Sequence, residues 1–120
     1  MSFLLDTDIC SAFQYTGQLS ISVISVGELF TWVYRNNAPQ TRLQGLLAIL
    51  YDLRVLDVNV PIARRFGEIR AQLLDRGHVV PTADMLIAAT AIEHGLTLVT
   101  HNARHYAGVP QLPMIDWLLP

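Results

Sequence analysis

Short apolar runs with strand character alternate with segments of helical periodicity along this 120-residue chain. Four strands are predicted over residues 2–7, 19–23, 54–58 and 96–100. A fifth, shorter strand is predicted around Met114. Helices are predicted between the strands, over residues 25–37, 39–52, 60–77 and 82–95. Residues 102–108 are predicted to form a turn or short helix. This alternation indicates an α/β fold, in which a mostly parallel sheet of four to five strands is covered by helices on both faces.

Length and composition favour one domain spanning residues 1–120. Apolar residues make up 52% of the chain and charged residues 15%, which suits a folded core and excludes a disordered, highly charged protein. Cys10 is the single cysteine, so no intrachain disulfide can form. The chain shows no signal-peptide pattern and no apolar run of the roughly 18 residues that a membrane helix needs. We therefore expect a cytoplasmic protein that does not enter a membrane.

Polar side chains are predicted where strands end. Asp6 ends the first strand, Glu28 lies in the first turn of the helix after the second, and Asn102 follows the fourth. Asp84 lies in the first turn of the helix that leads into the fourth strand. A right-handed crossover would start that helix at the carboxyl edge of the sheet, where the other three residues lie. Ligands of parallel sheets bind beyond the carboxyl ends of the strands. We therefore expect these four side chains to converge on one site.

Each acid also has a purely structural explanation. Ser25 and Glu28 have the spacing of a capping box at a helix start. Asp84 would favour a helix N-terminus through the macrodipole, and Asp6 could belong to a turn. Three carboxylates at one edge, however, repel one another unless a cation or a proton lies among them. Hard oxygen ligands of this kind favour Mg²⁺, with Mn²⁺ as a substitute.

Several segments, in this order along the chain, resemble the PIN domain and, within it, VapC-type toxins of type II toxin–antitoxin pairs. They are "LLDTDI", "ISVISVGEL", "FGEIRAQLLDRGHVVPTADMLIAATA" and "GLTLVTHNARHY". The resemblance implies a three-layer α/β/α sandwich and a Mg²⁺-dependent endoribonuclease that cleaves RNA. It also implies a homodimer held inactive by an antitoxin protein. By motif match, Asp6, Glu28 and Asp84 become the catalytic and metal-binding acids, and Asn102 takes the fourth catalytic position.

Two features depart from the family pattern. Asn102 stands where many relatives have Asp, which removes one formal charge and favours a single metal ion. The connection between the first two strands covers only residues 7–18, whereas a parallel crossover usually needs about a dozen residues or more, often with a helix. Either its helix is reduced, or the sequence lacks a loop that the natural protein has; an intact mass well above 13.4 kDa would indicate the second.

Other residues carry weaker signals. Arg64, Arg65, Arg70 and Arg76 lie along one predicted helix and could contact RNA phosphates, an antitoxin or neighbouring acids.

Past Asn102, Arg104 and His105 could reach the substrate, and a zinc site using His94, His101 and His105 is a remote alternative. Trp32 and Tyr34 could stack on unpaired bases, although packing between helices is the more ordinary role of Trp32.

Two other functions remain open. One is a PIN-like module that binds RNA or a partner without cleaving it. The other is a phosphoacceptor receiver domain, which usually needs a lysine beside its acidic pocket. All eight Lys and Arg residues of this chain are arginine, which argues against a receiver.

Overall fold

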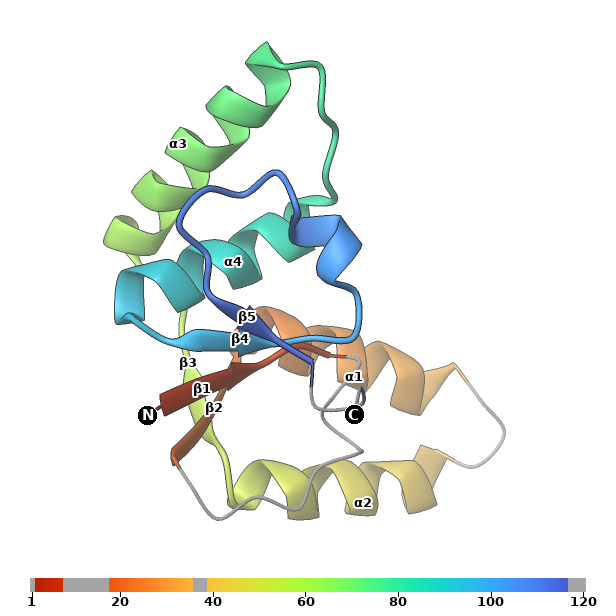
Figure 1. Ribbon diagram of the computed structural model, residues 1–120. Coiled ribbons are helices and arrows are strands. Elements are labelled where there is room, and N and C mark those ends of the chain that lie inside the picture. Colours follow the sequence, from red (N-terminus) through yellow and green to blue (C-terminus); the bar gives the residue numbers. More distant parts are fainter. Residues whose placement is uncertain (1, 8–17, 36–38, 117–120) are drawn as a thin grey trace.

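Five parallel strands form a single sheet in the computed structural model, which describes residues 2–7, 18–35 and 39–116 (Figure 1). The strand order is β3-β2-β1-β4-β5. The bounds are β1 Ser2–Leu5, β2 Gln18–Ser22, β3 Arg54–Leu56, β4 Thr97–Val99 and β5 Met114–Ile115. The α/β fold and the fifth strand are thus confirmed. The predicted connection at 7–18 lies outside the described residues, except for its two ends.

Among the described residues, four α-helices and one 3₁₀-helix lie between the strands. They are α1 Val23–Tyr34, α2 Pro39–Tyr51, α3 Val60–Asp75, α4 Thr82–His94 and η1 Ala103–Tyr106. Gly77 and Gly95 follow the ends of α3 and α4 with φ values of 74° and 65°, a left-handed conformation that favours glycine. Within the described ranges, no helix is both long and apolar enough to cross a membrane.

The central strands β1, β2 and β4 are buried on both faces, which gives the molecule three layers. Leu4 and Leu98 belong to a core cluster with α3, α4 and η1, whereas Leu5, Ile21 and Val99 belong to a second cluster with α1 and α2. Successive strand residues alternate between the two clusters because their side chains point to opposite faces. Figure 1 shows α3 and α4 on one side of the sheet and α2 on the other. The predicted sandwich is confirmed.

Helix α1 begins earlier than the sequence pattern suggested. Its N-cap is Ser22, whose Oγ accepts a hydrogen bond of 3.1 Å from the Ile24 amide, and Ser25 lies inside the helix. The prediction that Ser25 caps the helix in a capping box with Glu28 is therefore wrong. Glu28 lies in the second turn rather than the first, because the strand ends at Ser22 and the helix follows without a loop.

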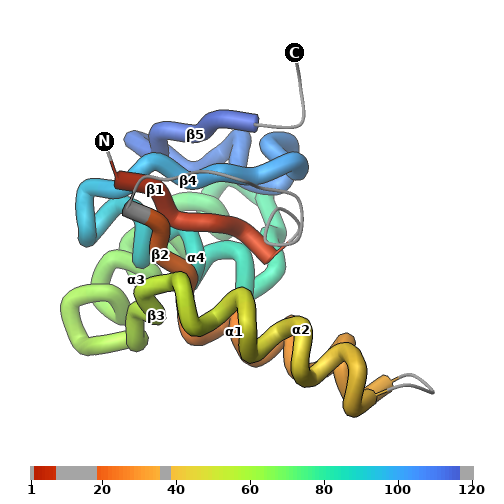
Figure 2. Tube along the Cα trace, turned by 90° about the horizontal axis from the view of Figure 1, so that it is seen from below, coloured from red at the N-terminus to blue at the C-terminus, as the bar shows by residue number. Residues whose placement is uncertain are grey.

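Helices α1 and α2 pack side by side and extend beyond the sheet (Figures 1 and 2). Val26, Val33 and Leu46 are buried in this pair, as their spacing predicted. Leu47, predicted on the same face of α2 as Leu46, is instead half exposed. The pair therefore presents a long outer surface that begins near the carboxyl edge of the sheet, where α1 starts.

Candidate active site at the carboxyl edge

The chain reverses its direction of travel across the sheet at β1. From β1 it proceeds to β2 and β3 on one side, and it then returns to add β4 and β5 on the other. The carboxyl ends of β1 and β4 therefore form a topological switch point, which is where open α/β sheets bind their ligands. A main-chain hydrogen bond links the ends of these two strands, since the Asp6 N–H donates to the Val99 carbonyl at 2.9 Å.

Asp6 lies at this switch point as a buried carboxylate with three hydrogen-bond donors. Its Oδ1 accepts from the Thr7 amide at 2.8 Å. Its Oδ2 accepts from the Thr100 hydroxyl at 2.8 Å and from the Tyr106 hydroxyl at 3.1 Å. Only 5% of Asp6 is exposed, so these bonds replace the water that a carboxylate would otherwise hold. They fix the position of the carboxylate and leave lone pairs for a further ligand.

Asp84 lies close enough to Asp6 for the two charges to interact. Burial raises the pKa of Asp84 above its ordinary value, and the negative charge of Asp6 raises it further. Hydrogen bonds from His105 and Tyr106 oppose this rise in pKa. His105 Nδ1 is 3.1 Å from Asp84 Oδ2. Asp6 and Asp84 thus lie near each other at the carboxyl edge, and the Tyr106 hydroxyl lies within reach of both.

The fold brings Asp84 to this edge because α4 runs antiparallel to the strands. Asp84 is in the first turn of α4, as predicted, and the middle of the helix is buried in the core between α3 and the sheet. Its buried residues are Met85, Ile87, Ala88, Ala89, Thr90 and Ala91. Burial on nearly all sides holds the helix in place and so restricts where the Asp84 carboxylate can lie.

Glu28 is joined to this pair through Thr7. The Thr7 hydroxyl donates to Glu28 Oε1 at 2.8 Å, while the Thr7 amide donates to Asp6. Glu28 is exposed on α1. Asn102 is also exposed, and its backbone N–H donates to the Thr100 hydroxyl at 3.0 Å. All four predicted residues lie at the carboxyl edge, but Glu28 and Asn102 each reach Asp6 through a threonine.

The described residues include no group of three His, Cys, Asp or Glu side chains arranged to hold a metal ion. The donors at the edge are nevertheless carboxylate and amide oxygens, which suit Mg²⁺ or Mn²⁺. The interaction between the Asp6 and Asp84 charges also leaves an excess of negative charge that a cation would neutralise. The chemistry of the two carboxylates therefore suits a divalent ion, which Asp6 and Asp84 would hold and which Glu28 would join directly or through water.

Three residues of this site carried no role in the sequence analysis, namely Thr7, Thr100 and Tyr106. Tyr106 is almost completely buried in η1, and Thr7 sits between two acids in "DTDI". Tyr106 contacts a residue 100 positions away, so no local pattern could reveal it. Thr7 is adjacent to Asp6, and a hydroxyl beside a candidate metal ligand was the available signal.

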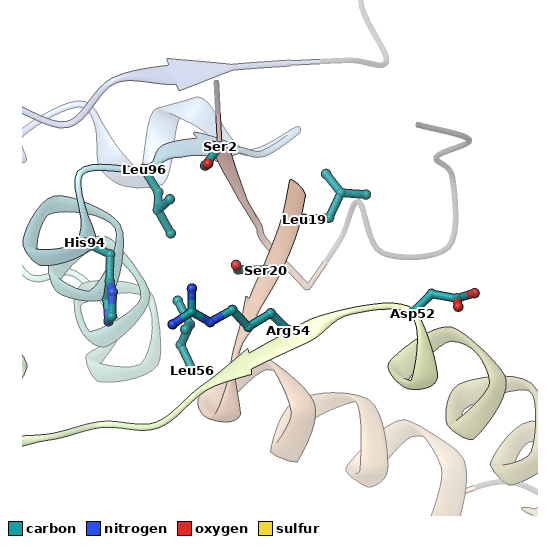
Figure 3. A pocket seen from close by; sticks show the side chains of 8 residues that line it. All are labelled: Ser2, Leu19, Ser20, Asp52, Arg54, Leu56, His94 and Leu96. Atoms are coloured by element: carbon teal, nitrogen blue, oxygen red, sulfur yellow. The ribbon is translucent and has the colours of Figure 1, made fainter. Parts of the chain in front are cut away.

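The histidines do not form the zinc site considered as an alternative. His101 Nδ1 lies 2.9 Å from Asp116 Oδ2, whereas His105 contacts Asp84. His94 lies elsewhere, beside a cavity of about 460 Å³ that also contains Ser2, Ser20, Asp52 and Arg54 (Figure 3). These residues occupy the amino ends of the strands. That cavity is therefore at the edge opposite the candidate active site.

Arginines on α3 are partly neutralised by neighbouring acids. Arg64 and Arg65 lie 3.6 and 3.7 Å from carboxylate oxygens of Glu68, and Arg65 also pairs with Glu93 at 3.1 Å. This supports the interpretation of that part of the helix as a solvated surface with internal ion pairs. For Arg70 and Arg76, the role in binding RNA or a partner stays a prediction.

Comparison with known proteins agrees with this geometry. The PIN domain family matches residues 4–109. A relative from Salmonella typhimurium, named tRNA(fMet)-specific endonuclease VapC, is 31% identical, with 98% of each chain covered. Its alignment spans 130 positions, more than the length of this chain, so some of its residues have no counterpart here.

Ribonuclease VapC2 of Haemophilus influenzae is 32% identical over 92% of this chain and 85% of its own. Among solved structures, DNA-bound VapBC from Salmonella typhimurium superposes with a TM-score of 0.89 at 29% identity, covering 98% of each chain. The chain belongs to the PIN domain family and, within it, to the VapC ribonucleases.

Proposed function

We propose that this protein is a divalent-metal-dependent endoribonuclease, the toxin of a toxin–antitoxin pair, and that it hydrolyses RNA phosphodiester bonds at the carboxyl edge of its sheet. The observation that carries the proposal is the buried Asp6 carboxylate beside Asp84 at the switch point. Relatives named as VapC ribonucleases support the reaction. Transfer RNA is the first substrate to test, because the Salmonella relative is named for it.

The roles of the residues follow from their placement. Asp6 and Asp84 would hold the ion, Mg²⁺ in the cell with Mn²⁺ as a substitute, and Glu28 would ligate it or orient the attacking water. When bound, a divalent ion polarises a phosphoryl oxygen and lowers the pKa of water for attack. Thr100 and Tyr106 hold the Asp6 carboxylate, and Asn102 completes the polar ring. His105 positions Asp84 through its hydrogen bond.

Partners are proposed on the same basis. Solved neighbours are VapBC complexes, so we propose that a cognate antitoxin binds and inhibits this chain. A homodimer in the cytoplasm is the assembly that we expect. Co-expression with a candidate VapB-type antitoxin, followed by gel filtration with light scattering, would test both the complex and the dimer.

The test of the reaction is cleavage of total RNA and of purified transfer RNA by the isolated protein, with Mg²⁺, with Mn²⁺ and with EDTA. We expect metal-dependent cleavage that Asp6→Asn and Asp84→Asn each abolish. Asp52→Asn is the matched control, because Asp52 lies at the opposite edge of the sheet and should keep full activity. Retained cleavage in either site variant would contradict the assignment.

A second function is favoured by one observation, namely that no three candidate metal-binding side chains are grouped within the described residues. On this alternative the chain binds RNA without cutting it. Calorimetric titration would select it by showing RNA binding without metal and intact RNA with metal. A rise in the unfolding midpoint with Mg²⁺, lost in Asp6→Asn, would instead support the metal site independently of cleavage.

A further inference from the structure

A groove follows the outer face of α1 away from the candidate active site. It is lined by Glu28, Thr31, Trp32 and Arg35, and its volume is about 440 Å³. These residues are spaced three and four apart, so they lie on one face of the helix. We call this the α1 groove. Glu28 also accepts the hydrogen bond from Thr7 beside Asp6, so the α1 groove begins at a residue of the candidate active site.

The indole of Trp32 is held at this groove with half of its surface exposed. Trp32 is 50% exposed, although packing between helices was its expected role. The guanidinium carbon of Arg42 on α2 lies 4.5 Å from the centre of its ring, and Arg42 Nη1 donates to the Trp32 carbonyl at 3.3 Å. These contacts restrict the ring from one side. The indole therefore presents a preorganised aromatic surface to a ligand.

Positive charge accompanies this aromatic surface. In the part of the chain that the structure describes, neither Arg35 nor Arg42 forms a salt bridge with an acid. Arg35 lies at the end of α1 and is exposed. Proteins bind single-stranded nucleic acid with exposed aromatic rings accompanied by positive charge, stacking bases on the ring and holding phosphates beside the cations.

We propose that the α1 groove binds the unpaired stretch of RNA that leads into the active site, with one base stacked on Trp32 and a backbone phosphate contacted by Arg35. The inference rests on the proposed function, because it takes RNA as the substrate. Glu28 and Arg35 are seven residues apart, or about 10 Å along a helix. That length accommodates two or three nucleotides at about 3.4 Å per stacked base. Paired bases cannot stack on the indole, so the groove selects single-stranded RNA.

The test is the affinity of the full chain for a labelled single-stranded oligoribonucleotide, measured by fluorescence anisotropy in EDTA so that the RNA stays uncut. We expect Trp32→Ala to raise the Kd about tenfold, as for the loss of one stacked base, and Trp32→Phe to retain most of the affinity. Tyr51→Ala is the matched control, because Tyr51 is a 90% exposed aromatic residue at the far end of α2. Its Kd should equal that of the wild type.

A second readout reports directly on the ring. The chain contains two tryptophans, so in a Trp117→Phe background Trp32 is the sole emitter. Single-stranded RNA should quench its fluorescence, and a duplex of equal length at equal concentration should not. Arg35→Gln should weaken binding and reduce the dependence of the Kd on salt.

The outcomes separate this inference from the proposed function. If Trp32→Ala binds single-stranded RNA as tightly as Tyr51→Ala does while metal-dependent cleavage persists, the inference is wrong and the nuclease assignment stands. If the wild type neither binds nor cleaves RNA, both are wrong. If Trp32→Ala loses affinity for the antitoxin but keeps its affinity for RNA, the α1 groove is a protein-binding surface, and the inference is again overturned.

Discussion

Hydrogen bonds to Asp6 come from residues on three segments of the chain, and all three donors are neutral. Thr7, Thr100 and Tyr106 satisfy the carboxylate without neutralising its charge. An arginine or lysine in the same place would form an ion pair and compete with a metal ion. Neutral donors instead fix the geometry of Asp6 and keep its full negative charge available, which is what a ligand of a divalent cation requires.

Replacing Asp84 by asparagine should stabilise the metal-free fold. A carboxylate whose pKa is raised by folding gives up stability as the pH rises through that folded-state pKa. At pH 7 in EDTA we therefore expect Asp84→Asn to raise the free energy of unfolding.

Urea denaturation at several pH values would measure this difference. The difference in stability between the variant and the wild type should narrow as the pH falls. It should vanish below the ordinary carboxyl pKa of 3.8, where the wild-type side chain is protonated in both the folded and the unfolded state. A variant less stable than the wild type at pH 7 would show that the hydrogen bond with His105 outweighs burial and the charge of Asp6.

Removing the Tyr106 hydroxyl should impair catalysis while leaving the core intact. Tyr106→Phe keeps the buried ring but deletes the donor to Asp6 Oδ2. A hydrogen bond to a charged group contributes about 1.5–3 kcal/mol, so we expect kcat to fall roughly tenfold or more. Single-turnover cleavage kinetics would check this, with Tyr51→Phe as the exposed control. Unchanged kinetics would remove Tyr106 from the site.

At the scale of elements, the start of α1 shows how a local signal can be ambiguous. Ser22 caps the helix, whereas Ser25 is fully buried, and its Oγ has no hydrogen-bond partner within the described structure. Ser22→Ala should therefore cost about 1 kcal/mol of stability. Ser25→Ala should be neutral or slightly stabilising, because it removes a buried polar atom that gains nothing from folding.

Thermal and chemical unfolding of the two variants would distinguish these roles. Equal losses of stability in both would contradict the observed cap. The comparison is well matched, since the two substitutions delete the same hydroxyl three residues apart in one segment.

Sequence reasoning succeeded where the signal is local or repeated. Gly95 and the apolar residues of α4 predicted that helix, and parallel strand ends predicted where Asp6 and Asp84 meet. The start of α1 was missed because Ser22 and Ser25 are equally good caps locally. The choice depends on the pairing of Ser22 with Leu56 across the sheet. Tyr106 was missed because its partner is set by the fold alone.

At the scale of the whole molecule, α4 supports both the core and the site. Ile87, which is fully buried in its centre, lies one turn from Asp84. We expect Ile87→Ala to lower the free energy of unfolding by about 2–5 kcal/mol, because a large buried side chain leaves a cavity. Urea denaturation would measure the loss, and a cost below about 1 kcal/mol would mean that the layer between α4 and the sheet is loosely packed.

The bonds from Thr100 and Tyr106 to Asp6 join the last fifth of the chain to its first strand. A ribosome makes Asp6 before Thr100 and Tyr106, so a nascent chain carries the first acid before its supporting donors exist. An interrupted or proteolysed product that lacks the segment after β4 holds an incomplete site. The order of synthesis thus delays assembly of the site until the segment after β4 has been made.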